Sequence, residues 1–185
     1  DIQGLEVFTG ADGEELWYIA TDGGLYRSSD RLETVKNLSL SGLRISQYYS
    51  TLTSAANPEN VAAGAQDQGY QLTQGVAQDG DIWAFDQVIS GDYGHLTSGD
   101  GTHGVVFSVY PGFMLVQVGE DEPWLDYPEF PEGETYAWLP PVVADPEAPE
   151  NVFFCASHLW YYRATDEGWI PELWSEQDFG ARDGE

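Results

Sequence analysis

Cysteine, lysine and methionine are almost absent from this sequence. A single cysteine, Cys155, excludes an internal disulfide and a zinc site built from several thiolates. It stands within an apolar run, where a thiol is expected to be inert and buried. No apolar run is long enough to cross a bilayer, and none has the form of a secretory signal. The chain also lacks an initiating methionine, so we expect a processed or excised part of a longer protein.

Positive charge is equally scarce. The 185 residues carry 32 acidic and 6 basic side chains, which gives a formal net charge of −26. The basic residues are scattered along the chain, and this disfavours nucleic acid and anionic membrane surfaces as partners. Abundant Asp and Glu with scarce lysine would also suit a high-salt habitat.

Apolar and aromatic residues are plentiful, and they favour a folded chain over an acidic disordered one. Hydrophobic residues make up 42% of the sequence, with 7 Trp, 11 Tyr and 8 Phe. No segment shows a 3.6-residue apolar stripe over three turns, whereas short apolar runs alternate with Gly, Pro, Asn and Asp. The sequence therefore predicts an all-β fold.

A hairpin pattern recurs along the chain at intervals of 44 to 47 residues. Each unit has a short apolar run, a tight turn and a second run rich in Tyr, Leu or Val. The four units are LWYIATDGGLYRSSD from Leu16, VAAGAQDQGYQLTQG from Val61, VVFSVYPGFMLVQVG from Val105 and VFFCASHLWYYRATDEG from Val152. Further strand-like runs flank each hairpin, so we expect four strands per unit.

Four-stranded units at this spacing predict the blades of a β-propeller. We expect four blades at about 1–43, 44–90, 91–133 and 134–185, forming one propeller segment, an arc or half of a larger ring completed by further blades of the same chain. A β-sandwich is the alternative, but it gives no reason for a fixed spacing. An isolated arc would leave apolar faces of its two terminal blades uncovered.

The segment SSDRLETV resembles the Asp-box of BNR-repeat propellers, Ser-x-Asp-x-Gly-x-Thr-Trp. Ser28, Asp30 and Thr34 match, while Leu32 replaces Gly and Val35 replaces Trp. The resemblance implies a turn between the third and fourth strands of a blade, and such side chains favour bonds to nearby backbone groups. A second, more worn copy is ATDEGW, which keeps Asp166 and Gly168. We therefore interpret Asp30 as a structural brace and not as a catalyst.

Residues 45–69, ISQYYSTLTSAANPENVAAGAQDQG, resemble a blade of the sortilin-like and xyloglucanase-like propellers. The resemblance implies a turn motif of the form Gly-x-Gln-Asp-x-Gly after an aromatic strand and an Asn-Pro pair. The matching residues are Gln47, Tyr48, Tyr49, Asn57, Pro58, Gly64, Gln66, Asp67 and Gly69. The last unit is similar to the commonest blade form of the same group.

The densest patch of Asp, His and Gly is SGDYGHLTSGDGTHG, residues 90–104, and three interpretations compete. The first treats its Gly-Asp pairs as turns. The second is a loop that binds Ca²⁺, although its spacing matches no known motif. Apart from this possible Ca²⁺, we expect no cofactor. The third follows from the xyloglucanase resemblance, which implies an acid and a base facing across a cleft. Asp92 is then the catalytic candidate, and its partner would lie on another blade outside this chain. The patch also contains His95, Asp100 and His103.

Other site types find less support. A sialidase needs three converging arginines, and only Arg44 and Arg163 are well placed. We interpret His158 as a turn residue. Aromatic residues could stack on sugar rings, although their default role is blade packing; the candidates are Tyr48, Tyr49, Trp83, Trp124, Trp138, Trp160 and Trp169.

The sequence therefore predicts a binding or scaffolding module, secreted or at the cell surface, that recognises a protein or glycan partner. The alternative is part of a glycoside hydrolase that acts through paired aspartates.

Overall fold

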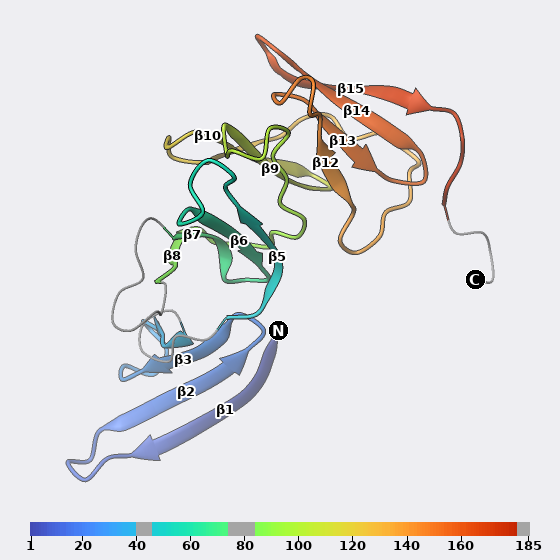
Figure 1. Ribbon diagram of the computed structural model, residues 1–185. Helices are drawn as coiled ribbons and strands as arrows, with labels where there is room; N and C mark the ends of the chain where they lie inside the picture. Colours follow the sequence, from blue (N-terminus) through green and yellow to red (C-terminus); the bar gives the residue numbers. More distant parts are fainter. Residues whose placement is uncertain (40–45, 74–83, 181–185) are drawn as a thin grey trace.

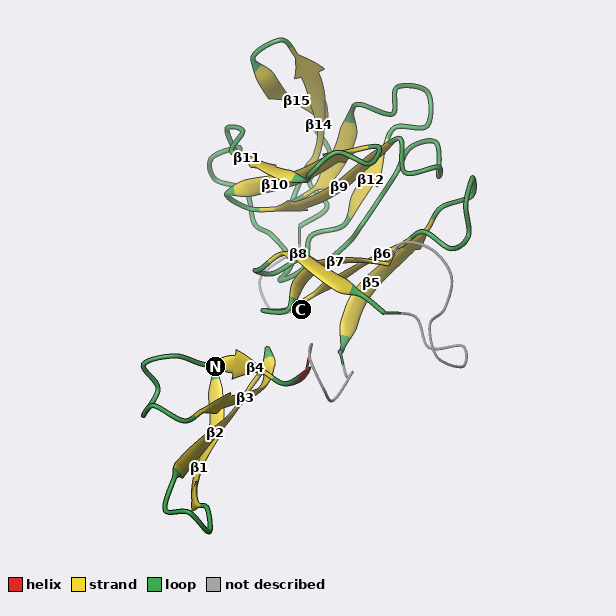
Figure 2. Ribbon diagram, turned by 90° about the vertical axis from the view of Figure 1, so that its left-hand side faces the viewer, coloured by secondary structure: helices red, strands yellow, loops and turns green. Residues whose placement is uncertain are grey.

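The structure is a computed structural model that describes residues 1–39, 46–73 and 84–180. Every named element in these ranges is a β-strand, which confirms the predicted all-β class. Figure 2 shows strands joined by loops, with one short helical turn after β4. No helix in the described ranges is long and apolar enough to cross a membrane. Arg44 and Trp83 lie outside the described residues.

The strands form four consecutive antiparallel sheets, each hydrogen-bonded in chain order (Figure 1). Sheet 1 contains β1 (Ile2–Thr9), β2 (Glu15–Thr21), β3 (Gly24–Ser28) and β4 (Lys36–Asn37). Sheet 2 contains β5 (Tyr48–Thr53), β6 (Val61–Ala65), β7 (Gly69–Thr73) and β8 (Asp86–Ile89). Sheet 3 contains β9 (Val105–Tyr110), β10 (Phe113–Val118) and β11 (Trp124–Asp126). Sheet 4 contains β12 (Val142–Ala144), β13 (Val152–Cys155), β14 (Leu159–Thr165) and β15 (Gly168–Ser175).

Sheet 3 departs from the expected four strands. Where the other sheets have their first strand, it has a single bridge between Thr97 and Phe107, with backbone hydrogen bonds of 2.9 and 3.0 Å. The preceding chain is rich in glycine and aspartate, which favour turns over extended pairing. The patch 90–104 therefore runs past β9 as a loop that pairs at two isolated bridges, Gly91 with Gln68 and Thr97 with Phe107.

Two loops of identical length open the central hairpins of sheets 2 and 4. Ser54 N–H donates to the Asn60 carbonyl at 3.0 Å, and Asp145 N–H donates to the Asn151 carbonyl at 2.9 Å. Each loop ends in the same Pro-Glu-Asn-Val sequence, and each is stiffened by proline. The same type of loop therefore precedes Val61, the first residue of β6, and Val152, the first residue of β13.

The core lies between sheets and not within any one of them. Tyr70 of sheet 2 packs with Val106 and Leu115 of sheet 3, and Phe107 of sheet 3 packs with Phe154 of sheet 4. Side chains alternate between the two faces of a strand, so sheet 3 is covered on both faces. Sheet 1 lies at one end of the row and sheet 4 at the other (Figure 1).

Candidate functional site

Tyr49 leaves the regular pattern of its strand because it sits in a β-bulge. Tyr48 pairs with Ala65 and Ser50 with Gly64, so Tyr49 is the extra residue between them. A bulge redirects a side chain, and this one brings the Tyr49 ring edge-on to Trp138, with centroids 5.3 Å apart. The Tyr49 hydroxyl donates to Gln66 Oε1 at 2.5 Å.

The turn between β6 and β7 supplies the polar neighbours of Tyr49. Asp67 adopts a left-handed backbone conformation with φ 57°, which aspartate tolerates better than most residues. Its N–H donates to Asp92 Oδ1 at 2.8 Å. Gly69 ends the turn, and a Cβ there would lie 1.9 Å from the Ile89 carbonyl oxygen. Only glycine lets the end of β8 approach this closely.

We refer to Tyr49, Gln66, Asp67, Asp92 and Trp138 together as the Tyr49 surface. Trp138 is 60% exposed, so its indole presents an apolar plane to solvent. Burial raises the pKa of the Tyr49 hydroxyl, and the negative charges of Asp92, Asp22 and Asp67 raise it further. The Tyr49 surface thus combines two aromatic rings, an amide and carboxylates, drawn from segments far apart in the sequence.

Gln68 connects this surface to sheet 1, and sequence reasoning missed it. Its Nε2 donates to the Gly23 carbonyl at 3.1 Å, and its own carbonyl accepts from Gln71 and Gln87. The side chain is 5% exposed. A glutamine in a short turn carries no local signal of contact with another hairpin.

The predicted Asp-box turn joins β3 to β4, and its three matching side chains bond within the turn. Asp30 Oδ1 accepts from Ser28 Oγ at 2.7 Å and from Thr34 N–H at 3.0 Å, while Oδ2 accepts from Thr34 Oγ1 at 2.6 Å. Ser28 Oγ accepts from Leu32 N–H at 2.9 Å. The bonds from Thr34 and Ser28 lower the pKa of Asp30 to about 2. Leu32, at the position of the usual glycine, has φ 73°.

The turn between β14 and β15, predicted to be a second Asp-box, is braced by a different side chain. Thr165 Oγ1 donates to the Gly168 carbonyl at 2.7 Å and accepts from Glu167 N–H at 3.2 Å. Gly168 has φ 115°, which suits glycine. Within the described chain, the Asp166 carboxylate makes no hydrogen bond, so Thr165 braces this turn.

Asp100 braces a turn in the same way as Asp30. Its carboxylate accepts from Ser98 Oγ at 3.0 Å, Thr102 N–H at 2.8 Å and Thr102 Oγ1 at 2.6 Å. The Thr102 hydroxyl is the main cause of its lowered pKa, with the Thr102 N–H second. Asp100 lies at the opposite strand ends from Asp92, because the chain between them passes β9 through Thr97.

His103 lies beside a small cleft at the same ends of the strands as Asp100. The cleft has a volume of about 140 Å³ and is lined in part by Asn57, Asn60 and Gln117. Burial lowers the pKa of His103, and its Nε2 is shielded from solvent without a hydrogen-bond partner in the described ranges. Over residues 1–39, 46–73 and 84–180, no group of three His, Cys, Asp or Glu side chains could hold a metal ion.

Glu134 forms a compact polar cluster that the sequence did not indicate. Its side chain is 7% exposed and accepts from Ser157 Oγ at 2.5 Å and His158 N–H at 2.9 Å, with His158 Nδ1 2.8 Å away. Burial raises the pKa of Glu134, but the three bonds outweigh it, and the net pKa is lowered. Ser157 donates to the carboxylate and not to the imidazole, so the cluster lacks the serine–histidine bond of a hydrolytic triad.

The structure places two further stacking candidates, Trp160 and Tyr48, and the single cysteine, Cys155. Trp160 is partly buried and packs against the core between sheets 3 and 4. Tyr48 donates to Gln71 Oε1 at 2.9 Å within sheet 2. Cys155 is half-buried, and burial raises the pKa of its thiol. Of Tyr48, Tyr49 and Trp160, only Tyr49 packs against an exposed ring, that of Trp138.

No protein-family model matches the chain, and no curated protein matches it.

Proposed function

We propose that this chain is an arc of a BNR-type propeller that acts as a binding module and recognises a neutral glycan at the Tyr49 surface. The observation that carries the proposal is the exposed Trp138 indole set edge-on against Tyr49, with Gln66, Asp67 and Asp92 beside it. An aromatic plane can stack on the apolar face of a sugar ring, while amide and carboxylate oxygens accept hydrogen bonds from its hydroxyls.

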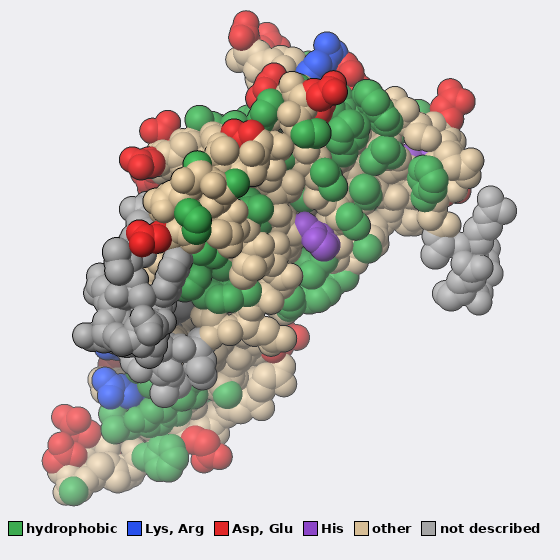
Figure 3. Space-filling model, viewed as in Figure 1, with side chains coloured by type: hydrophobic (Ala, Val, Ile, Leu, Met, Phe, Trp, Pro, Cys, Tyr) green, Lys and Arg blue, Asp and Glu red, His purple; other side chains and the backbone are tan. Residues whose placement is uncertain are grey.

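The charge of the molecule narrows the glycan class. Figure 3 shows Asp and Glu side chains along much of the margin of the viewed face, with few Lys or Arg. Sialic acid, uronic acid and sulfated sugars would be repelled by Asp67 and Asp92 and by the net charge of −26. The proposed ligand is therefore an uncharged oligosaccharide. A protein partner remains the alternative within the same binding class.

One contact and one missing group favour binding over hydrolysis at Asp92. Its Oδ1 is engaged by the Asp67 N–H, and a second carboxylate across a cleft, which an inverting hydrolase needs, would come from outside this chain. The proposed setting is extracellular or at the cell surface, in an organism that tolerates high salt.

The test is calorimetric titration with neutral β-glucan and xyloglucan oligosaccharides. Trp138→Ala should weaken binding at least about tenfold, since losing a central aromatic contact costs more than about 1.4 kcal/mol. Trp124→Ala is the matched control, because Trp124 is also exposed, at 40%, but lies on β11. Equal loss in both variants, or binding by neither the protein nor its variants, would contradict the proposal.

A further inference from the structure

Residues 134–139, in the connection between β11 and β12, join the cluster around Glu134 to the Tyr49 surface. The Thr135 N–H donates to Ser157 Oγ at 3.2 Å, and the Thr135 carbonyl accepts from the Ser157 N–H at 2.9 Å. Trp138 follows three residues later, and Figure 1 shows part of this connection between sheet 4 and β5. Three residues of extended chain span at most about 11 Å, so the turn between β13 and β14 lies close to Trp138.

The side chains that are exposed between these two points are small. Thr135 and Ala137 are exposed, whereas Tyr136 is partly buried and packs with its ring centroid 5.6 Å from that of Phe154. Over residues 134–138, all of which the structure describes, no exposed aromatic or long aliphatic side chain other than Trp138 is present. A ligand that covers Trp138 can therefore continue along this segment toward sheet 4.

His158 lies at the far end of this segment, and Glu134 fixes the orientation of its ring. Glu134 is 7% exposed, and its carboxylate lies 2.8 Å from His158 Nδ1 and accepts the His158 backbone N–H at 2.9 Å. An ionised carboxylate only accepts hydrogen bonds, so Nδ1 is the donor and Nε2 points away from Glu134. A ring that is already fixed loses little conformational freedom when it binds a ligand.

The second ring nitrogen of His158 is available to a ligand. Within the described chain, His158 Nε2 makes no hydrogen bond, and, unlike Nε2 of His103, it is not shielded from solvent. In the neutral ring Nε2 accepts a hydrogen bond, and in the protonated ring it donates one. A sugar hydroxyl can both donate and accept, so it can bind to either form of the ring.

We propose that a glycan bound at the Tyr49 surface runs along residues 134–138 and places a hydroxyl group on His158 Nε2. This inference rests on the proposed function, because Trp138 anchors the same glycan. The ligand is accordingly a neutral oligosaccharide long enough to reach both side chains. His158 is its second binding residue, and Glu134 is the positioning residue of His158.

Calorimetric titration with cellobiose and with cellohexaose tests the proposal. Cellohexaose should bind more tightly, because the shorter sugar covers Trp138 alone. Trp138→Ala should weaken the binding of both sugars. His158→Asn should weaken the binding of cellohexaose about fivefold, which is the affinity that one net hydrogen bond contributes, and should leave the binding of cellobiose unchanged.

Two substitutions of His158 separate a ligand contact from a structural brace. His158→Asn retains an amide N–H near the position of Nδ1, which can still bind Glu134, and removes the group at Nε2. His158→Gln places its amide near the position of Nε2 and loses the bond to Glu134. The Gln variant should therefore bind cellohexaose more tightly than the Asn variant, although urea denaturation should show that it is the less stable of the two.

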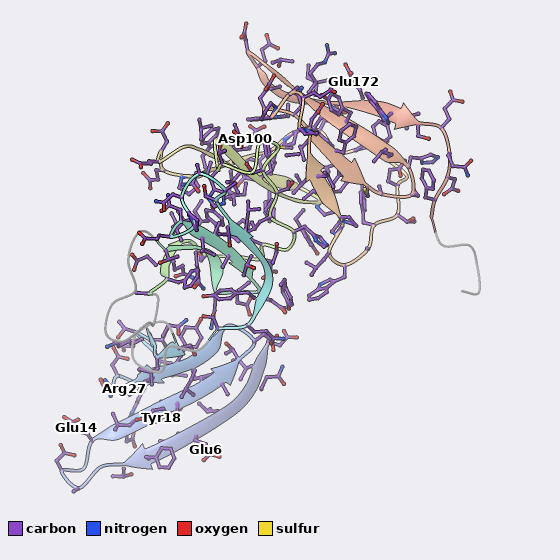
Figure 4. The ribbon with its side chains drawn as sticks, viewed as in Figure 1. Glu6, Glu14, Tyr18, Arg27, Asp100 and Glu172 are labelled. Atoms are coloured by element: carbon purple, nitrogen blue, oxygen red, sulfur yellow. The ribbon has the colours of Figure 1, made fainter. Side chains whose placement is uncertain are left out.

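His103→Asn is the matched control, because it makes the same change at the opposite ends of the strands. Figure 4 labels Asp100, which lies at those ends, well apart from the connection that leads into β12. This variant should bind both sugars as the unmodified protein does. Asparagine also tolerates the left-handed backbone of His103, at φ 65°, better than most residues do.

Nitrogen NMR of the imidazole rings provides a readout that does not depend on a variant being folded. The chain has 3 His residues, so their signals can be assigned with the two histidine variants. The Nε2 signal of His158 should shift when cellohexaose is added and should not shift with cellobiose.

Either of two results would overturn the inference. One is cellohexaose binding that depends on Trp138 but is not weakened by His158→Asn and does not shift the Nε2 signal. This result would leave the proposed function of the Tyr49 surface intact. The other is binding of neither sugar, or binding that Trp138→Ala does not weaken, which would remove the proposed function as well. The two failures are therefore distinguishable.

Discussion

The carboxylate of Asp92 accepts the backbone N–H of Asp67 at 2.8 Å, and so ties the loop that leaves sheet 2 to the turn in the middle of that sheet. Asp67 is held at φ 57° in the same turn. A side chain in this position can brace a loop without taking part in chemistry, which leads to a direct test.

Asp92→Asn should leave both stability and glycan binding nearly unchanged, because the amide oxygen can accept the same N–H. Asp92→Ala should lower the free energy of unfolding by about 1 kcal/mol through loss of that hydrogen bond. Chemical denaturation measures the free energy of unfolding of both variants, and release of reducing sugar from β-glucan measures hydrolytic activity. Turnover that Asp92→Asn abolishes would establish the hydrolase alternative.

Leu32→Gly should stabilise the protein by about 0.5 to 1 kcal/mol. Leucine at φ 73° has a steric strain energy that glycine lacks. Removing this strain stabilises the folded state by more than the added conformational entropy of glycine stabilises the unfolded chain. Val35→Gly in the same turn is the control, since Val35 is exposed and does not have a positive φ; it should destabilise. Thermal unfolding of the two variants should move in opposite directions.

Asp30 should contribute stability that depends on pH. Its pKa is about 2 in the folded protein, against about 3.9 when unfolded, so its contribution is fully present above about pH 4. It is lost as the pH falls through 2. The stability difference between the protein and Asp30→Asn should therefore be constant above pH 4 and shrink toward pH 2. A difference that does not change over this range would contradict the hydrogen-bonded carboxylate.

Glu134→Gln should lower stability by about 2 kcal/mol at neutral pH, because a buried carboxylate loses charge-assisted bonds from Ser157 and His158. The folded pKa of Glu134 is lowered, so the difference from the parent protein should narrow as the pH falls below about 4.3. Glu132→Gln is the control in the same loop, where the side chain is exposed. Equal urea midpoints for both variants would show that the cluster contributes nothing.

The strands and the turns between them could be predicted from the sequence. Alternating apolar runs predicted strands because side chains of a strand point alternately to its two faces. Ser28, Asp30 and Thr34 could be interpreted as a turn because their bonding partners lie within a few residues. The recurring hairpins predicted consecutive sheets, and the structure has four, although Thr97 alone stands for the first strand of sheet 3.

Relations across the chain were decided only by the tertiary structure. Tyr49 contacts Trp138 because a β-bulge redirects the Tyr49 ring and a long connection brings Trp138 back to sheet 2. Neither segment has a sequence pattern that predicts this contact. The contacts of Glu134 with Ser157 and His158 likewise join segments that are distant in the sequence. Trp160 and Trp138 each have an aliphatic and an aromatic residue within two positions in the sequence, yet one packs between sheets 3 and 4 and the other faces solvent. Periodicity specifies which side chains share a face of a sheet, but only the packing of one sheet on another determines whether that face is covered.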